Sequence, residues 1–137
     1  MADELIFKSA SFQEASKSNF TTNAYGKELN VDIPKDFGGP GKFFSPEDLY
    51  LASVVNCFIA TFNVVASKSK FDFDALETKN ELKLKKDDSG KYFCDKVSIW
   101  LSVDCKDKFK LEKIVDLTKK SCIIHSSIKT RVEVIIV

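Results

Sequence analysis

Four cysteines and one histidine have the strongest capacity for redox or nucleophilic chemistry in this chain. The cysteines are Cys57, Cys94, Cys105 and Cys122, and His125 follows the last of them by three residues. A thiolate can act as a nucleophile, a metal ligand or half of a disulfide, depending on its surroundings. The chain contains no Cys-x-x-Cys pair, and Cys122 with His125 supplies only half of a zinc site. We therefore expect thiol chemistry without a metal.

The positive charge of the chain comes almost entirely from lysine. Lysine and arginine together number 21, and Arg131 is the single arginine. A site that requires the planar, two-point recognition of a guanidinium group therefore has one candidate. The formal net charge of +1 argues against a protein that tracks phosphate groups, because such proteins carry a basic excess. We expect no nucleic-acid partner.

The N-terminal residues and one apolar stretch bear on the cellular location. The sequence MADELIFKSA lacks the basic start and apolar run of a signal peptide, which predicts a cytoplasmic protein with reduced thiols. Residues 49–67 carry no charge and approach the length of a membrane span. Polar side chains such as Asn56 and Thr61 interrupt this stretch. It is better interpreted as a buried helix, with no membrane association.

The pattern of elements predicts an α+β fold in a chain of single-domain length, 137 residues. Residues 1–34 have β character around Leu5–Phe7, Phe20–Thr22 and Leu29–Ile33, with a turn at Tyr25–Lys27. Residues 36–41 are rich in glycine and predict a loop without helix. Ser45, Pro46, Glu47 and Asp48 form a helix start, and the helix should run to about Ser67.

This long helix is apolar on nearly every face, which predicts burial on all sides. A domain of this size can barely surround such a helix, and a partner subunit covering one side would solve the problem. Residues 82–105 predict two strands joined by a turn at residues 87–90. Regular alternation would place Cys94 and Cys105 on opposite faces of the second strand.

The C-terminal part of the chain predicts a helix and a final strand. Residues 108–120 form the helix, with Cys122 directly after it and a strand over residues 132–136 to close the chain. The apolar face expected for this helix consists of Phe109, Leu111, Ile114, Val115 and Leu117. The predicted architecture is long helices packed on mostly antiparallel sheet.

Two linked motifs extend this interpretation. The first comprises GGPG at residues 38–41, SPEDL at residues 45–49 and NCF at residues 56–58. The second is SCIIHS at residues 121–126, before an alternating C-terminal strand. Together they resemble the two signatures of the OsmC/Ohr family, the osmotically inducible protein C and organic hydroperoxide resistance proteins. The resemblance covers roughly residues 5–137 and implies a single OsmC-like domain over 1–137 in an intertwined homodimer with a long buried central helix.

The family resemblance implies thiol peroxidase chemistry. By that analogy the thiolate of Cys57 attacks an organic hydroperoxide and becomes a sulfenic acid. Cys122 resolves the sulfenic acid as a Cys57–Cys122 disulfide, which a dithiol reductant, for instance of lipoyl type, then opens. No cofactor is required. Glu47 matches the family's catalytic carboxylate, yet it lies about 15 Å along the helix from Cys57. Antiparallel helices in a dimer would bring Glu47 of one chain toward Cys57 of the other.

Two departures from the family pattern bear on this function. The family's activating arginine is not matched: the corresponding positions lie near Lys17 and Phe37, and Arg131 is in the last strand. Lys17 is a candidate replacement for the positive charge. His125 stands where serine is common, and it is either a group that tunes Cys122 or a packing residue. The alternatives to a peroxidase are a non-catalytic binder of a small hydrophobic or thiol ligand and a redox sensor based on the same disulfide.

Overall fold

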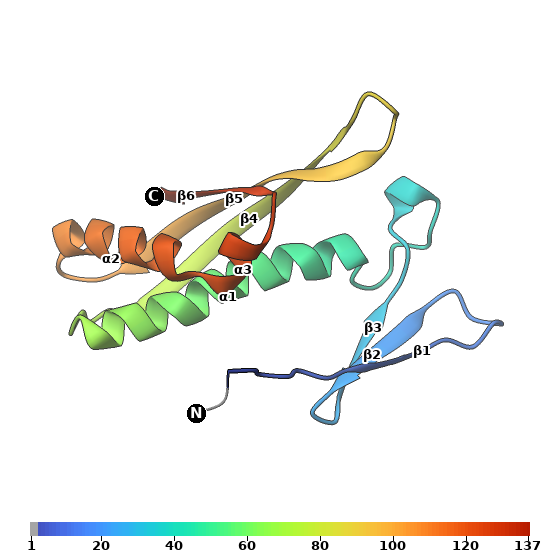
Figure 1. Cartoon of the computed structure of the whole chain (residues 1–137), viewed down its shortest axis with the longest axis horizontal. Helices are drawn as coiled ribbons and strands as arrows, with labels where there is room; N and C mark the ends of the chain where they lie inside the picture. Colours follow the sequence, from blue (N-terminus) through green and yellow to red (C-terminus); the bar gives the residue numbers. More distant parts are fainter. Residues whose placement is uncertain (1–2) are drawn as a thin grey trace. The chain divides into compact units, whose positions relative to one another are not determined.

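The structure is a computed structural model and describes residues 3–137. The chain divides into two compact units, one ending at Leu49 and the other running over Tyr50–Val137. Figure 1 shows the elements along the chain. The expectation of one domain over residues 1–137 stays a prediction.

A three-stranded antiparallel sheet forms most of the first unit (Figure 1). Its strands are β1 (Ala10–Phe12), β2 (Phe20–Ala24) and β3 (Lys27–Val31), in that order across the sheet. Tyr25 and Gly26 connect β2 to β3 with positive φ angles of 54° and 71°. Two such residues form the tight turn whose twist matches that of the flanking strands. The predicted turn and the β structure on either side of it are confirmed.

The predicted β structure at Leu5–Phe7 was wrong. These residues belong to no strand, and their side chains are 76–82% exposed. A short apolar run forms a strand only where a neighbouring strand pairs with its backbone. The pairing with β2 begins at Ala10 instead.

One turn of 3₁₀ helix, η1 (Lys35–Phe37), lies in the glycine-rich loop after β3. The amide of Gly38 donates to the carbonyl oxygen of Lys35 at 3.0 Å, and Gly38 ends the turn with a φ of 83°. The expectation that residues 36–41 contain no helix was therefore wrong. A glycine can end such a turn in the left-handed conformation at little cost, so this loop accommodates it.

The long helix α1 (Pro46–Lys68) begins at the predicted proline. Ser45 and Asp48 cap it reciprocally. The amide of Asp48 donates to Ser45 Oγ at 3.0 Å, while the amide and hydroxyl of Ser45 both donate to Asp48 Oδ2 at 2.9 Å. The predicted start and length of this helix are confirmed.

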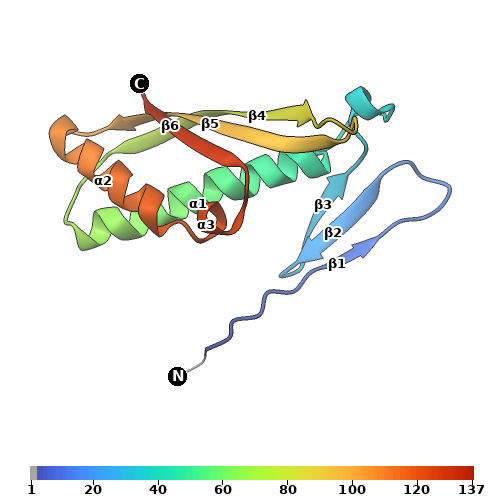
Figure 2. The same ribbon diagram turned by 45° about the horizontal axis from the view of Figure 1, so that its top comes forward.

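The second unit places helices on one face of a three-stranded sheet of order β4-β5-β6. β4 (Ala75–Lys86) and β5 (Tyr92–Asp104) are antiparallel, and β6 (Arg131–Ile136) is parallel to β5. α2 (Lys108–Ser121) and the short α3 (Ile123–Ser127) connect β5 to β6. Figure 2 shows both on the same side of the sheet as α1. The α+β class with mostly antiparallel sheet is confirmed, whereas α3 was not predicted.

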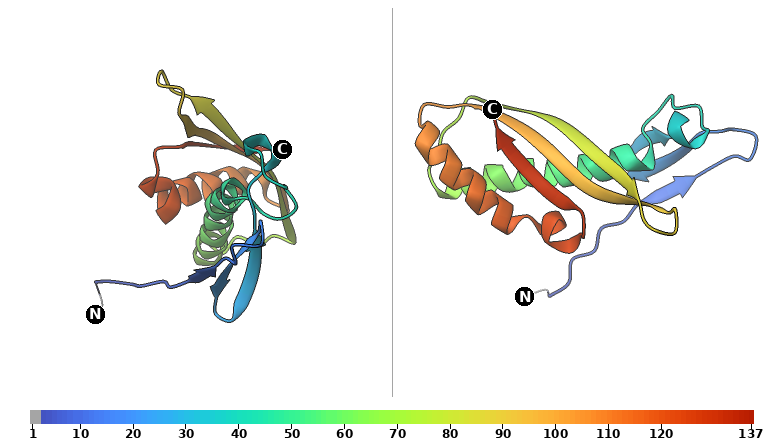
Figure 3. Two further views of the ribbon diagram at one scale, coloured as in Figure 1. Left: turned by 90° about the vertical axis from the view of Figure 1, so that its right-hand side faces the viewer. Right: turned by 90° about the horizontal axis from the view of Figure 1, so that it is seen from above.

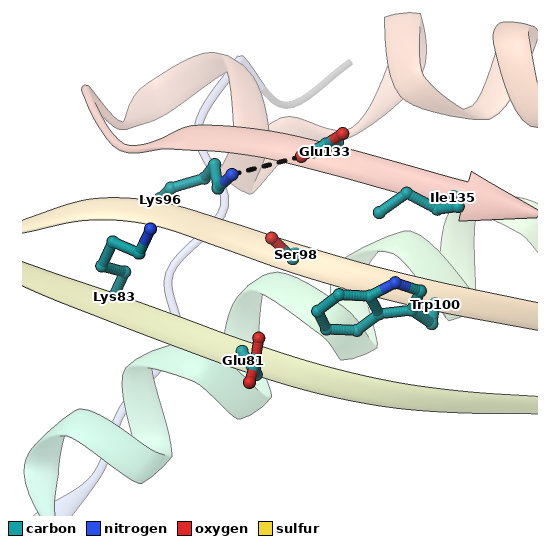
Figure 4. Close-up of a pocket in the computed structure, with 7 residues that line it drawn as sticks. All are labelled: Glu81, Lys83, Lys96, Ser98, Trp100, Glu133 and Ile135. Carbon is teal, nitrogen blue, oxygen red and sulfur yellow. Dashed lines mark ion pairs between the residues drawn. The ribbon is translucent and has the colours of Figure 1, made fainter.

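The core of this unit lies between α1, α2 and the inner face of the sheet (Figure 3). β5 contributes every second residue to this face, as its alternation predicted. The buried hydrophobic residues of α1 and β5 are Val54, Val55, Phe58, Phe62, Ala66, Val97, Ile99, Leu101 and Val103. The opposite face of the sheet carries polar and charged side chains together with Trp100 and Ile135 (Figure 4), and there Lys96 Nζ lies 3.4 Å from Glu133 Oε2.

α1 is buried on only part of its circumference within this chain. Val64 is 53% exposed, and 28% of the most apolar 18-residue window of the helix is buried. Within residues 3–137, α1 is the one helix that is long and apolar enough to cross a membrane. Its packing against the sheet is that of a core helix. The sheet and α2 leave part of the helix uncovered, as expected for a small domain, and the partner subunit expected to cover that side stays a prediction.

The buried face of α2 differs in two positions from the prediction. Leu111, Ile114 and Val115 are buried, but Phe109 and Leu117 are 72% and 48% exposed. Thr118 is instead fully buried, and its hydroxyl donates to the carbonyl oxygen of Ile114 at 2.7 Å. Positions 111, 114, 115 and 118 form one stripe at helical spacing, and 109 and 117 lie outside it.

A β-bulge in β5 changes the face on which Cys94 lies. The pairing of β4 with β5 passes from Lys83–Lys96 to Leu84–Cys94, so Asp95 is the extra residue. Directly paired residues share a face, so Cys94 lies on the inner face with Leu84. The prediction that Cys94 and Cys105 lie on opposite faces required a regular strand, and the bulge removes that condition.

Candidate thiol site

Cys57 and Cys122 lie together in the second unit. Cys57 is half-buried in the middle of α1, and Cys122 is 1% exposed at the junction of α2 and α3. Their thiols contact each other, and both cysteines are in the reduced thiol form. The structure therefore brings together the two cysteines that the sequence singled out.

The break between α2 and α3 positions Cys122. Its backbone is extended, with φ −71° and ψ 116°, so it ends one helix and begins the next. The amide of Ser126 donates to the carbonyl oxygen of Cys122 at 3.1 Å, which closes the turn of α3. Within a continuous helix, the direction of a cysteine side chain follows from the path of that helix. Because the helix is interrupted at Cys122, the direction of its side chain does not follow from α2 alone.

The two thiols have different surroundings. Burial and the neighbouring thiol of Cys57 raise the pKa of Cys122 from 9.0 to about 11, and a hydrogen bond from Thr61 partly opposes this rise. Cys122 is therefore a neutral thiol at neutral pH. Cys57 is the more accessible of the two, since Cys122 is almost fully buried.

Thr61 belongs to this site and was not predicted as a site residue. It lies one turn after Cys57 on α1, and its side chain hydrogen-bonds Cys122. It also lines an open hollow of about 410 Å³, together with Ala60, Val64, Val65, Lys68 and Ser121. The signal in the sequence was the four-residue spacing between Cys57 and Thr61, which places the Thr61 hydroxyl and the Cys57 thiol on one face of the helix.

His125 ties α3 to α1. Its Nε2 donates to the carbonyl oxygen of Val54 at 3.0 Å, and its ring stacks on Phe58 with centroids 6.3 Å apart and planes at 13°. These contacts are those of a packing residue. They also hold the segment that carries Cys122 against the helix that carries Cys57.

Glu47 lies in the first turn of α1, ten residues before Cys57. Its Oε1 atom is buried without a hydrogen-bond partner among the described residues. The helix start does not use this carboxylate, because Asp48 forms the cap with Ser45. Burying a carboxylate oxygen without a hydrogen-bond donor costs free energy. Oε1 of Glu47 is therefore an acceptor whose hydrogen-bond donor is not among the described residues.

The two basic residues considered for the site lie elsewhere in their units. Lys17 is exposed between β1 and β2, and its Nζ is 3.8 Å from Glu14 Oε2. Arg131 begins β6, where its Nη2 donates to Asp95 Oδ2 at 2.9 Å, and Lys85 lies 3.5 Å from the same oxygen. Asp95 is the bulge residue, so Arg131 stabilises an irregular part of the sheet.

The remaining cysteines are separate from the thiol pair. Cys94 lies at the bulge, and Cys105 is half-buried just after β5, with its Sγ 3.9 Å from the carbonyl oxygen of Asp107. Across residues 3–137, no three His, Cys, Asp or Glu side chains gather in a way that could hold a metal ion.

Solved structures share this architecture at low sequence identity. An OsmC-like protein of unknown function from Vibrio cholerae superposes with a TM-score of 0.87 at 18% identity, covering 98% of this chain and all of the other. An organic hydroperoxide resistance protein OsmC from Legionella pneumophila has a TM-score of 0.76 at 18% identity, with 97% of each chain covered. OhrB of Bacillus subtilis has a TM-score of 0.70 at 18% identity, with 96% of each chain covered.

No curated protein matches the sequence. The structural likenesses, all at low identity, establish the fold. The model of the OsmC-like protein family matches residues 39–137, well over half of the chain. That region includes the helix start, α1 with Cys57, and Cys122 with the elements after it. The chain therefore belongs to the OsmC-like protein family.

Proposed function

We propose that this protein reduces organic hydroperoxides with the thiol pair Cys57 and Cys122. The observation that carries the proposal is the contact between a half-buried thiol on α1 and a buried thiol at the α2–α3 junction. Family membership and the names of the Legionella pneumophila and Bacillus subtilis proteins support a role in defence against peroxide stress.

The reaction balances with these two thiols and an external dithiol. The Cys57 thiolate attacks the distal oxygen of the hydroperoxide, the O–O bond breaks, and the alcohol leaves after taking a proton. Cys122 then attacks the sulfenic sulfur of Cys57, so that the S–S bond forms and water leaves with the proton of Cys122. A dithiol, for instance of lipoyl type, exchanges with this disulfide and becomes oxidised as both cysteines return to thiols.

The surroundings of the two thiols support this division of roles. The attacking thiol must reach solvent and substrate, and Cys57 is the more exposed of the two. The raised pKa of Cys122 keeps it protonated at neutral pH, so it is a poor competitor for the hydroperoxide. Its contact with Cys57 provides the short path that disulfide formation requires.

The hollow beside Thr61 supports an organic rather than an inorganic peroxide. Apolar side chains of Ala60, Val64 and Val65 line it, and Thr61 connects it to Cys122. The alkyl or aryl part of an organic hydroperoxide can bury apolar surface there. Hydrogen peroxide has no such group to bury.

A homodimer completes the site in this proposal. The uncovered side of α1, with Val64 half-exposed, is the surface that a second copy would cover. Glu47 lies too far along α1 to reach Cys57 of its own chain, since ten residues span about 15 Å. We infer that Glu47 of one chain serves Cys57 of the other. A lysine, with Lys17 as the first candidate, takes the place of the family's arginine.

The proposed working environment is the cytoplasm, where thiols stay reduced. The test is consumption of cumene hydroperoxide with dihydrolipoamide, comparing the wild type with Cys57→Ser, Cys122→Ser and the matched control Cys105→Ser. We expect loss of turnover in both site variants and none in the control. Unchanged turnover in Cys57→Ser would refute the peroxidase.

The two alternative functions give different outcomes in the same experiment. Rapid formation of the Cys57–Cys122 disulfide without turnover indicates a redox sensor. If neither turnover nor disulfide formation is observed, the remaining function is that of a non-catalytic binder of a small hydrophobic ligand.

A further inference from the structure

Asp32 is a buried carboxylate for which the thiol chemistry gives no reason. It follows β3 directly and is 1% exposed. Within residues 3–137 no lysine, arginine or histidine forms an ion pair with it. Burying a carboxylate without a cation is costly unless hydrogen bonds replace its water. The hydrogen bonds of Asp32 therefore have to replace that water.

The hydrogen bonds of Asp32 join the end of β3 to the residues just before α1. Its Oδ2 accepts from the amide of Lys42 at 2.9 Å, and its Oδ1 accepts from the amide of Phe43 at 3.3 Å. Its own amide donates to the carbonyl oxygen of Phe44 at 3.0 Å. Three bonds from one residue therefore close the loop of residues 33–43 at its base.

Further contacts make this loop rigid. The amide of Gly41 donates to the carbonyl oxygen of Ile33 at 3.2 Å, and Val31 pairs with Phe44 in a parallel bridge. A Cβ atom on Gly39 would lie 2.0 Å from the carbonyl oxygen of Ile33, so the backbone packs there without room for a side chain. The loop is thus a closed structure despite its glycines.

The fixed segment runs without interruption from Asp32 to Glu47. Phe44 is held by the bridge and by the amide of Asp32, and Ser45 is 4% exposed and caps α1 with Asp48. Pro46 has its φ restricted by its ring. These contacts fix the backbone of each residue before Glu47 relative to β3. They therefore also fix the point on the backbone from which the side chain of Glu47, with its buried Oε1, extends.

We propose that Asp32 is a positioning residue for the thiol site, because its carboxylate holds the segment that presents Glu47. This inference rests on the role of Glu47 in the proposed function. Asp32 acts through Glu47 alone, so its effect should disappear when Glu47 lacks its charge.

A double-mutant cycle tests this dependence. The variants are Asp32→Asn, Glu47→Gln and the two together, with Asp36→Asn as control, since Asp36 is exposed in the same loop. The measurement is the rate at which iodoacetamide alkylates Cys57, followed by mass spectrometry of the peptide that contains it. This rate reports on the thiol whether or not the protein turns over peroxide. A failed peroxidase assay therefore leaves the test intact.

We expect Asp32→Asn to change the alkylation rate by about 10-fold, in the same direction as Glu47→Gln, because a small misplacement of a group acting on a reactive centre has effects of this order or larger. Glu47→Gln should change the rate at least as much, the double variant should match Glu47→Gln, and Asp36→Asn should match the wild type. Equal effects of Asp32→Asn in both backgrounds would overturn the proposal, and so would an unchanged rate in Asp32→Asn. Asp32→Glu, which keeps the charge, replaces Asp32→Asn if circular dichroism shows the latter unfolded.

Discussion

The imidazole of His125 donates from Nε2 to the carbonyl oxygen of Val54 across 3.0 Å, joining the segment after Cys122 to the helix that carries Cys57. The same ring stacks on Phe58. Both contacts set the distance between the two helices at the thiol pair. The geometry of the site therefore depends on a residue outside the thiol chemistry itself.

Replacing His125 by alanine should destabilise the protein and slow formation of the Cys57–Cys122 disulfide. The lost hydrogen bond and ring contact together amount to about 2 kcal/mol. Chemical denaturation measures the first effect, and quenched thiol trapping after a pulse of hydroperoxide measures the second. His125→Phe keeps the ring, so it should recover part of the stability. Equal stability of wild type and His125→Ala would show that the contacts contribute nothing.

The buried thiol of Cys122 should make stability fall at alkaline pH. Its pKa is raised from 9.0 to about 11 in the folded chain, so between these values the unfolded chain releases a proton that the folded chain retains. The contribution is complete below about pH 9 and is lost as the pH rises through 11. Urea unfolding at pH 8 and pH 10.5 should show a larger loss for the wild type than for Cys122→Ala. Parallel losses in the two proteins would contradict this.

Because Ser45 caps α1, Ser45→Ala should lower the free energy of unfolding by a measurable amount. Ser45 accepts from the amide of Asp48 and donates twice to its carboxylate. Losing an N-cap side chain costs about 1 kcal/mol, which thermal or chemical denaturation can detect. Ser53→Ala provides a control in the same helix, because the hydroxyl of Ser53 is exposed and bonds only to Tyr50 within the helix. A cost for Ser53→Ala equal to that for Ser45→Ala would argue against the cap.

Two neighbouring glycines should respond differently to alanine. A Cβ atom on Gly39 would lie 2.0 Å from a backbone oxygen, so Gly39→Ala forces the loop apart and should cost on the order of 3 kcal/mol. Gly38 has open space around it and a φ of 83°, so Gly38→Ala incurs only the cost of a left-handed backbone, about 1 kcal/mol. Denaturation midpoints of the two variants measure the difference. Equal costs would mean that the loop opens freely.

A charged side chain introduced on the uncovered side of α1 should change the oligomeric mass of the protein in solution. Val64 is 53% exposed on this side, so Val64→Glu should be tolerated by a lone chain but should separate a dimer. Sedimentation should give twice 15.4 kDa for the wild type and 15.4 kDa for the variant. Phe109→Glu, at a residue 72% exposed on α2, is the control and should leave the dimer intact. A wild-type protein that sediments as a single chain would refute the dimer.

The sequence by itself determined the order of the main elements apart from β1, η1 and α3, the start of α1 and the two signature motifs. These depend on local chemistry: Pro46 and the cap of Ser45 with Asp48 define a helix start, and alternation defines the inner face of β5. Regular alternation could not place Cys94, because the bulge at Asp95 moved it to the inner face. Local pattern also could not tell that Leu5–Phe7 has no partner strand.

Only the tertiary structure decided which groups surround the thiols. The contact of Cys57 with Cys122 was an inference from family resemblance, because their 65-residue separation says nothing about distance. The raised pKa of Cys122 and its bond from Thr61 depend on burial produced by packing of α1 against the α2–α3 junction. The bonds that join Asp32 to Lys42 and Phe43 likewise close a loop that has no periodic signal. Such contacts arise from the path of the whole chain, and local propensity does not encode them.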